Sequence, residues 1–307
     1  MSISVISLVL VAILILMLCM GQPLSWSLGA AAVVLCLMHF DTLRPITSFV
    51  NRIFDMAQSS TLMAVPLFVM MASILQRSGV AENLFKAAYI WAGGLRGGLA
   101  IGTIFANIIM AAMVGVVGAE IVTLGMVALP QMLKHKYDNT LALGTLAAGG
   151  GLATLIPPSV VFIVYGMTAS VSVAQLFTAG ILPGLILAFG YIAFIVIHCK
   201  RHPEAAPLPP QELRNLPFVE RLKVLKTLAL PCIITFGVLG SIYLGVATPN
   251  EAAGVGVVLV IICSLIMKTF NLKMLWESCL ETVKVSCMLS WLFFGAQTVI
   301  GAYTLAG

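Results

Sequence analysis

Residues Thr140–Tyr165 read TLALGTLAAGGGLATLIPPSVVFIVY, an apolar stretch that contains two helix-breaking signals. Three consecutive glycines, Gly149–Gly151, permit backbone conformations that a regular helix does not use. Pro157 and Pro158 lack backbone donors and resist a helix around them. In a membrane, such irregular backbone survives only where it lines a cavity or is buried in protein. The stretch therefore predicts a helix break at a binding site, and the alternative is a plain kinked helix that Ser159 caps.

Ser159 stands at the expected start of the helix that follows the two prolines. Free N–H groups and the positive end of the helix dipole favour an anion at such a position. We therefore predict that Pro158 and Ser159 contact a substrate. We also predict that backbone carbonyl groups near Gly149 and Gly151 coordinate an ion.

The composition of the whole chain agrees with a membrane location for this stretch. The 307 residues include 16 Lys or Arg and 11 Asp or Glu, so 9% of the chain is charged, whereas a soluble domain is about 25% charged. Apolar residues make up 61% of the chain. Such a chain is predicted to be an all-α, multi-spanning (polytopic) membrane protein embedded in the lipid bilayer. The same numbers exclude a disordered chain, a disulfide-rich secreted domain and a nucleic-acid-binding protein.

Motifs for enzymatic chemistry or for a resident cofactor are absent from the sequence. The seven cysteines form no C-x-x-C pair, and neither H-E-x-x-H, G-x-S-x-G nor a P-loop occurs. No His/Asp or Ser/Lys group is clustered in a way that would support catalysis. The chain is predicted not to be an enzyme and to bind no metal beyond a coupling ion.

A second interruption is predicted in the apolar run from residue 97 to residue 133. The run is about 37 residues long, whereas one straight span needs about 20. Gly115 and Gly118 lie in its middle and favour an unwound stretch or a turn between two half-helices. Because unwound carbonyl groups can coordinate Na⁺, both glycines are candidate ion-binding positions.

Glu120 follows these glycines and is the sole charge between Arg96 and Lys134. A carboxylate inside a membrane is costly and is therefore a candidate functional group, here for ion binding. The alternative is that Glu120 lies near the membrane surface and pairs with Lys134 or Lys136.

A third candidate region is a hairpin over residues 61–79. The segment Thr61–Leu75 is short for a membrane span and contains Pro66, which makes a re-entrant half-helix plausible. Ser73 is a small polar residue in this segment and a candidate substrate contact. Alternatively, its hydroxyl group bonds back to the carbonyl group four residues earlier.

Two further segments at the N-terminus have distinct patterns. Ile3–Met20 is apolar and has no preceding Lys or Arg, which favours a first transmembrane helix over a signal peptide. Residues 41–58 mix charges with apolar residues at helical spacing, as is typical of an arm that lies in the membrane interface.

Residues 199–227 form the one segment with the composition of a soluble linker. They contain six Lys or Arg and five prolines. By the positive-inside rule this basic linker is expected in the cytoplasm.

The linker divides the chain into a first repeat, residues 1–198, and the start of a second repeat, residues 228–307. Gly21–Trp26 and Gly245–Asn250 each follow an apolar helix and precede a helix of small residues. A charged amphipathic stretch and an apolar segment follow in both halves, and such repeats are typical of secondary transporters with inverted topology. By this spacing a full second repeat would extend to about residue 426. The sequence is therefore either a piece of a longer chain or not a complete two-repeat carrier.

Six blocks of sequence, in order along the chain, resemble the large membrane subunit of TRAP transporters, the tripartite ATP-independent periplasmic carriers of bacteria. The blocks are Val65–Phe68 with Arg77–Gly79, Arg96–Ala100, Leu129–Lys134 with Tyr137, Ile156–Ser159 with Tyr165–Gly166, Leu176–Gly184, and Ala247–Ala253.

The resemblance implies an elevator-type carrier in the bacterial inner membrane, in which a mobile domain with two hairpins moves substrate and Na⁺ against a scaffold. It also implies an organic acid as substrate, a small membrane subunit and a periplasmic substrate-binding protein as partners. The chain differs from the family pattern at Ala72, Ser73, Val116, Val117 and Glu120. We therefore expect the permease subunit of a sodium-coupled transporter. The alternative is a non-transporting membrane scaffold or accessory subunit.

Overall fold

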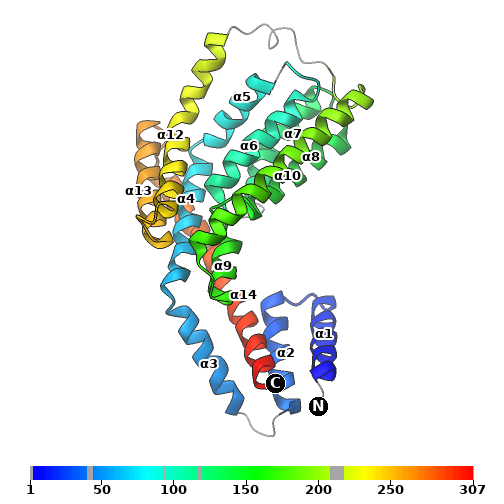
Figure 1. Cartoon of the computed structure of the whole chain (residues 1–307), viewed down its shortest axis with the longest axis vertical. Coiled ribbons are helices and arrows are strands. Elements are labelled where there is room, and N and C mark those ends of the chain that lie inside the picture. Colours follow the sequence, from blue (N-terminus) through cyan, green and yellow to red (C-terminus); the bar gives the residue numbers. More distant parts are fainter. Residues whose placement is uncertain (1–2, 40–43, 93, 116–118, 208–217, 307) are drawn as a thin grey trace. The chain divides into compact units, whose positions relative to one another are not determined.

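The computed structural model describes residues 3–39, 44–92, 94–115, 119–207 and 218–306, and these residues form helices and connecting turns without a strand (Figure 1). The prediction of an all-α fold is therefore confirmed. The chain divides into two compact units. We call Met1–Leu62 with Val283–Gly307 the terminal unit and Met63–Thr282 the central unit.

The terminal unit packs apolar side chains of its helices around small residues. It contains α1 (Ile3–Cys19), α2 (Leu24–His39), α3 (Arg44–Ala57) and the later turns of α14 (Leu272–Ala306). Ala31 and Ala32 of α2 are completely buried and allow the helices to approach closely. The buried cluster consists of Ile6, Leu10, Ala31, Ala32, Leu35, Cys36, Phe49 and Ala302.

Helix α3 is amphipathic, as its sequence predicted. Phe49 is buried and packs in the terminal unit, whereas Val50 and Phe54 are 59% and 61% exposed. Arg52 lies among these residues and donates a hydrogen bond of 3.4 Å to the Thr304 hydroxyl group of α14. The location of this arm in the membrane interface stays a prediction.

The central unit contains the remaining helices. A 3₁₀ turn, η1 (Ser60–Met63), leads into its first helix. The order is α4 (Ala64–Arg77), α5 (Val80–Ala92), α6 (Gly98–Val114), α7 (Ala119–Lys134), α8 (Asn139–Gly150), the 3₁₀ turn η2 (Gly151–Thr154), α9 (Val160–Ala169), α10 (Val173–Arg201), α12 (Phe218–Tyr243) and α13 (Pro249–Ile266). Helices α6, α7, α8 and α10 lie side by side, and α4 packs against α13 (Figure 1).

Glycines bring several of these helices into close contact. A side chain at Gly256 of α13 would meet the Met71 sulfur of α4 at 2.7 Å. A side chain at Gly102 of α6 would meet the Ala88 carbonyl carbon of α5 at 3.1 Å. Small residues at helix contacts are the usual way in which membrane helices pack, because they increase dispersion contacts between backbones.

The structure differs from the predicted hairpin over residues 61–79. Residues 64–77 form one uninterrupted helix, and the chain turns only at Ser78 and Gly79, where Gly79 has a φ of 76°. Pro66 is the third residue of α4, and a proline in the first turn removes no intrahelical hydrogen bond. Ser73 therefore lies within a helix and not at a hairpin tip.

Two other boundaries also differ from the sequence prediction. Residues 272–306 form the single helix α14, because no glycine or proline separates the amphipathic stretch from the apolar segment that follows. The predicted linker, residues 199–227, is shorter than expected, since α10 continues to Arg201 and α12 begins at Phe218. Residues 208–217 of that linker lie outside the described residues.

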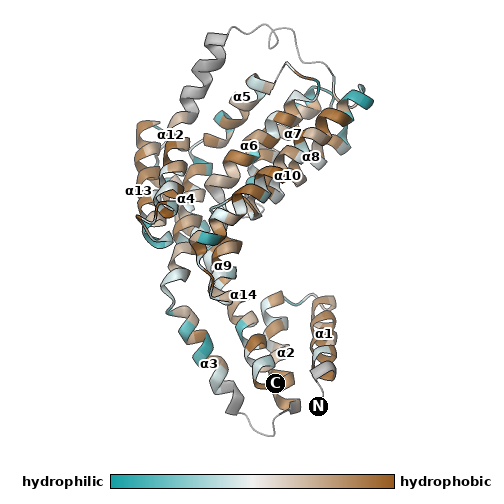
Figure 2. Cartoon of the chain, viewed as in Figure 1, coloured by the Kyte–Doolittle hydropathy of each residue, from teal (hydrophilic) through white to brown (hydrophobic). Residues whose placement is uncertain are grey.

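Four of the described helical segments are long and apolar enough to cross a membrane: Ser60–Arg77, Val173–Arg201, Pro249–Ile266 and Leu272–Leu305. Apolar residues cover most of α6, α10 and α13, and hydrophilic residues gather at the C-terminal end of α10 (Figure 2). At the end of α4, Arg77 donates hydrogen bonds of 2.6 Å to both Glu277 and Glu281 of α14, so one positive charge is shared by two carboxylates.

Candidate binding site at two helix interruptions

Helix α6 ends at Gly115, which has a left-handed backbone conformation with a φ of 61°. The Gly115 N–H group donates to the Ala111 carbonyl oxygen at 3.3 Å, which closes the last turn. A side chain at Gly115 would overlap the carbonyl oxygen of Pro158. Glycine is therefore required here both by its backbone conformation and by the contact with the second interruption.

The second interruption lies between α8 and α9. Helix α8 ends at Gly150, η2 follows, and residues 155–159 connect it to α9. The Val160 N–H group, the first of α9, donates to the Gly115 carbonyl oxygen at 3.1 Å. The two interruptions, whose contacting residues Gly115 and Val160 are 45 positions apart in sequence, are thus joined by a hydrogen bond and by van der Waals contact.

The glycines after α8 admit neighbouring side chains close to the backbone. A side chain at Gly149 would overlap the amide group of Asn107, and one at Gly150 would overlap Ile121 of α7. A side chain at Gly151 would meet nothing within 4 Å. The glycine run therefore has two functions: Gly149 and Gly150 permit close packing, and Gly151 borders open space.

Carbonyl groups at these glycines are partly engaged already. The Gly115 carbonyl oxygen accepts from Val160, and the Gly151 carbonyl oxygen accepts from the Thr154 hydroxyl group at 2.7 Å. Because a carbonyl oxygen has two lone pairs, the Gly115 carbonyl oxygen retains one acceptor position for a cation. The Gly151 carbonyl oxygen does not, because it also accepts from the Thr154 N–H group in the 3₁₀ turn η2. Gly118, the remaining predicted ion-binding glycine, lies outside the described residues.

Asn107 is a candidate that the sequence interpretation missed. It lies on α6, two turns before Gly115, and is only 1% exposed. Neither its amide oxygen nor its amide nitrogen has a hydrogen-bond partner among the described residues. Since Asn107 is the single Asn or Gln between Arg96 and Gln131, its isolation in an apolar run was a signal that could have identified it.

Glu120 lies in the first turn of α7 and is fully buried. Its carboxyl group approaches the backbone of Ala153 in η2, yet neither oxygen makes a hydrogen bond of regular geometry within the described chain. The alternative of pairing with Lys134 or Lys136 is wrong, because Lys134 lies in the last turn of α7, about 20 Å along the helix, and Lys136 follows that end.

Ser159 occupies the position immediately before α9, but its side chain does not cap the helix. Its hydroxyl oxygen is fully buried and has no hydrogen-bond partner in the part of the chain that the structure describes. The backbone carbonyl oxygen of Ser159 does accept, from Phe162 at 3.1 Å and from Ile163 at 3.3 Å. The alternative in which Ser159 is simply a helix cap is therefore wrong.

Ser73 lies on α4, which packs against both α6 and α9. It is 4% exposed, and its hydroxyl group makes no hydrogen bond within the described residues, including to the carbonyl group four residues earlier. The alternative of a local back-bond is thus wrong. Whether Ser73 contacts a ligand stays a prediction.

The residues around the interlocked interruptions form what we call the helix-break site: Asn107, Gly115, Glu120, Gly149, Gly151, Pro158 and Ser159. Buried polar atoms are normally hydrogen-bonded, so several unpaired ones in one region suggest that another group completes their bonding. The described chain has no group of three or more His, Cys, Asp or Glu residues arranged for a transition metal. The site offers oxygen atoms for binding and no paired nucleophile and base for catalysis.

Comparison with known proteins places the chain among transport permeases. Residues 11–307 match the family described as "Tripartite ATP-independent periplasmic transporter, DctM component". The chain is 34% identical to the C4-dicarboxylate TRAP transporter large permease protein DctM of Vibrio cholerae over 246 residues, which are 79% of this chain and 52% of that protein. It is 32% identical to the protein of the same name from Pseudomonas aeruginosa over 281 residues, 91% of this chain and 63% of that protein.

A further relative carries a different substrate in its name. The chain is 29% identical to the ectoine/5-hydroxyectoine TRAP transporter large permease protein UehC of Ruegeria pomeroyi over 307 residues, 95% of this chain and 70% of that protein. The chain thus spans from about half to 70% of the length of these relatives. The match covers almost the whole chain, including both interruptions. The chain therefore belongs to the DctM component family of tripartite ATP-independent periplasmic transporters, which are multi-pass membrane permeases and not enzymes.

Proposed function

We propose that this chain is part of a large permease subunit that imports organic acids by coupling their movement to Na⁺. The observation that carries the proposal is the helix-break site, where buried oxygen atoms without protein partners surround two interlocked interruptions in apolar helices. Family membership supports a role in transport. Moving one Na⁺ across about 100 mV releases about 2.3 kcal/mol, so two ions would support strong accumulation.

The cation would be held on the side of the site that faces α7 and η2. The Asn107 amide oxygen and the Glu120 carboxylate supply oxygen atoms, and hard cations prefer oxygen ligands. Gly149 and Gly115 keep Asn107 and the second interruption in place through their close contacts. In this arrangement Glu120 also supplies the negative charge that a buried cation requires.

The carboxylate of the substrate would bind where α9 begins. A helix N-terminus favours an anion through its dipole and its N–H groups. The buried Ser159 hydroxyl group adds a donor at this position, since it has no partner within the described chain. C4-dicarboxylates and ectoine, the solutes named for relatives, each carry a carboxylate that such a site would recognise.

An elevator-type mechanism with repeated units is part of the proposal. Its support is local: the turns after α1 and α12 each contain a glycine with positive φ, Gly21 at 78° and Gly245 at 69°. The residue after each glycine donates to a carbonyl oxygen five residues earlier, Gln22 to Met17 and Val246 to Ser241. The same turn thus joins α1 to α2 and α12 to α13, as a repeat would require.

The partners proposed for this chain are a small membrane subunit and a periplasmic substrate-binding protein, in the inner membrane of a bacterium. The test is uptake of labelled C4-dicarboxylates by the reconstituted three-component system, with and without an inward Na⁺ gradient. We expect uptake to fall at least tenfold without Na⁺. Full uptake in sodium-free buffer under a pH gradient alone would indicate proton coupling and refute the proposal.

The orientation of the basic linker has its own test. Glu204 is exposed and follows α10, whereas Ala206 is fully buried and would hide an introduced thiol. In a variant without native cysteines, we expect Glu204→Cys to resist a membrane-impermeant thiol reagent in intact cells and to react after lysis. Reaction in intact cells would place the linker in the periplasm.

A further inference from the structure

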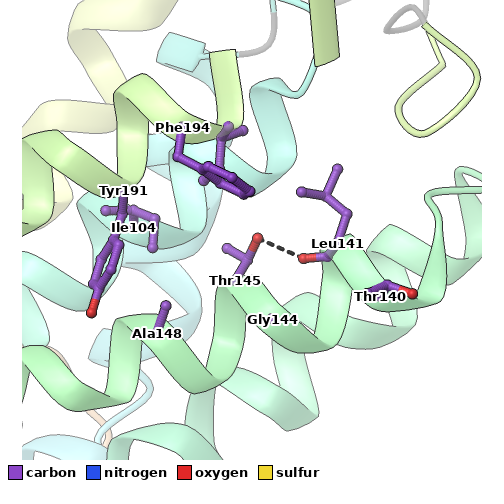
Figure 3. A pocket seen from close by; sticks show the side chains of 9 residues that line it. Ile104, Thr140, Leu141, Gly144, Thr145, Ala148, Tyr191 and Phe194 are labelled. Atoms are coloured by element: carbon purple, nitrogen blue, oxygen red, sulfur yellow. Dashed lines mark hydrogen bonds between the residues drawn. The ribbon is translucent and has the colours of Figure 1, made fainter. Parts of the chain in front are cut away.

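A second region of the central unit has the features of a ligand site, and it is separate from the helix-break site. Helices α6, α8 and α10 line a half-open cavity of about 380 Å³. In Figure 3, Tyr191 and Phe194 of α10 face Thr145 and Ala148 of α8 across this cavity. The Thr145 hydroxyl group donates to the Leu141 carbonyl oxygen of its own helix at 2.7 Å, so it offers little to a ligand.

The dimensions of the cavity favour a thin, flexible occupant. The lining residues of α8 run from Thr140 to Ala148, a distance of about 12 Å along the helix. An apolar lining of this length matches part of a single hydrocarbon chain, which is thin and flexible.

One end of the cavity lies beside a cluster of basic residues. Thr140 follows the connection that contains Lys134 and Lys136, and Ile195 precedes Lys200 and Arg201 on α10, all four of which are exposed. The Asp138 N–H group donates to the Ala205 carbonyl oxygen at 2.9 Å, which holds the two connections side by side. Figure 2 shows the hydrophilic residues that end α10.

The acidic residues described at this end, Asp138 and Glu204, are both engaged. The Asp138 carboxylate caps α8 by accepting from the Leu141 N–H group at 3.1 Å. The Glu204 carboxylate lies 3.2 Å from the His202 ring. Four Lys or Arg side chains and two carboxylates leave an excess of positive charge at the mouth of an apolar cavity.

The connection itself is anchored in the protein. The Leu99 N–H group at the start of α6 donates to the Tyr137 hydroxyl oxygen at 3.2 Å. Burial raises the pKa of Tyr137 to about 12, so this side chain stays neutral and leaves the positive excess unchanged at physiological pH. The basic cluster is thus held at a defined place relative to the cavity.

We propose that this cavity binds one anionic phospholipid, with an acyl chain between α8 and α10 and the phosphate group on Lys134, Lys136, Lys200 and Arg201. An apolar cavity with basic residues at its end matches the two parts of such a lipid, and basic pockets between membrane helices bind lipid head groups. By the positive-inside rule this lipid belongs to the cytoplasmic leaflet. The inference is independent of the transported substrate.

Gly144 provides a way to fill the cavity without disturbing the backbone. It lines the cavity, and a side chain added there would meet nothing within 4 Å. Gly144→Leu should therefore occupy the space of the acyl chain. Gly125 of α7 likewise has nothing within 4 Å and does not line the cavity, so Gly125→Leu is the matched control.

The charge of the site is tested by a second pair of variants. Lys200→Gln with Arg201→Gln removes two of the four proposed phosphate contacts. Lys268→Gln with Lys273→Gln removes two exposed charges at the ends of α13 and α14 and serves as the control. Each variant should unfold within a few degrees of the unmodified protein in detergent with neutral lipid alone, which shows that it has folded.

The measurement is native mass spectrometry of the purified full chain titrated with phosphatidylglycerol or phosphatidylcholine of identical acyl chains. We expect one phosphatidylglycerol to be retained with about tenfold preference. Gly144→Leu should lower its retention at least tenfold, and the Lys200/Arg201 variant should reduce the preference at least threefold, with both controls unchanged. Equal retention of the two lipids, or retention that Gly144→Leu leaves intact, would overturn the proposal.

Two further additions separate the sources of the signal. Inorganic phosphate at millimolar concentration should leave phosphatidylglycerol bound, because it lacks the acyl chain. Displacement by phosphate would instead assign the basic cluster to a free anion. Loss of the lipid when the small membrane subunit is added would assign the cavity to a partner protein, and either result would refute a lipid site.

Discussion

Two helices of the central unit, α9 and α13, begin beside a proline, yet their first turns differ. Helix α9 begins two residues after Pro158, and Pro249 is the first residue of α13. At α13, Thr248 and Glu251 form a capping box: the Glu251 carboxylate accepts from the Thr248 N–H group at 2.8 Å, and the Thr248 hydroxyl oxygen accepts from the Glu251 N–H group at 3.4 Å. At α9, Ser159 holds the corresponding position without making any side-chain cap.

The two helix starts also differ in how far they are exposed to solvent. The cap of α13 has exposed hydrogen bonds, whereas Ser159 is fully buried and its hydroxyl group has no partner among the described residues. Water can satisfy an exposed helix start, but a buried one needs protein or ligand. The start of α13 is thus complete by itself. At the start of α9 the Val160 N–H group is bound by Gly115, but the Ser159 hydroxyl group has no partner within the described chain.

The largest expected difference is in the stability of variants at two glycines with positive φ, Gly115 beside α9 and Gly245 before α13. An alanine at either position adopts an unfavourable backbone, which costs about 1–3 kcal/mol. At Gly115 the added carbon would also overlap the Pro158 carbonyl oxygen, whereas at Gly245 it would meet nothing within 4 Å. We expect Gly115→Ala to abolish monodisperse protein in detergent and Gly245→Ala to lower the melting temperature by only a few degrees. Equal melting temperatures would show that the contact between the interruptions is loose.

The sequence was sufficient to predict the helical class, the breaks near Gly115 and after Gly149, and the helix that starts after Ser159. These features depend on local signals, since glycine runs and adjacent prolines disfavour a helix whatever surrounds them. The single helix at residues 64–77 was not predicted. Pro66 breaks a helix if it lies in the interior and is tolerated if it lies in the first turn, and the sequence does not say where the helix begins.

The arrangement of the candidate site was less predictable. The contact of Asn107 with Gly149 and the hydrogen bond between Val160 and Gly115 join residues that are about 40 positions apart. No local pattern records such a pairing, and it follows only from how α6, α8 and α9 pack. Sequence identified Glu120 and Ser159 as exceptions in apolar runs and missed Asn107, and the structure was needed to bring the three together.

A second prediction compares the two glutamates of the first helical turns, Glu120 of α7 and Glu251 of α13. If Glu120 is a cation ligand, Glu120→Gln removes a charge-assisted contact, and we expect the Na⁺ concentration for half-maximal uptake to rise about 10- to 100-fold. Glu251→Gln keeps a capping box, so it should leave uptake unchanged and cost about 0.5 kcal/mol of stability. The measurement is uptake against Na⁺ concentration, together with thermal unfolding. An unchanged Na⁺ dependence in Glu120→Gln would remove Glu120 from the ion site.

The smallest expected effects come from the two hydroxyl residues that precede α9 and α13. Ser159→Ala deletes a hydroxyl group without a protein partner, so we expect a change in stability of less than about 0.5 kcal/mol. If that hydroxyl group donates to the carboxylate of the substrate, uptake at low substrate concentration should fall about fivefold. Thr248→Ala deletes a helix cap and should cost about 1 kcal/mol of stability while leaving uptake unchanged.

The two variants are informative as a pair because Ser159→Ala should lower uptake without lowering stability, whereas Thr248→Ala should lower stability without lowering uptake. A general loss of folding would lower both stability and uptake in each variant, so expression level and thermal unfolding must be measured beside uptake. Ser159→Thr is the conservative control, because it restores a hydroxyl group and should recover part of the uptake if space allows the extra methyl group. If Ser159→Ala instead lost stability and kept normal uptake per folded molecule, Ser159 would serve the fold as Thr248 does. The two helix starts would then differ in burial alone, and the anion-binding role would have to move elsewhere in the helix-break site.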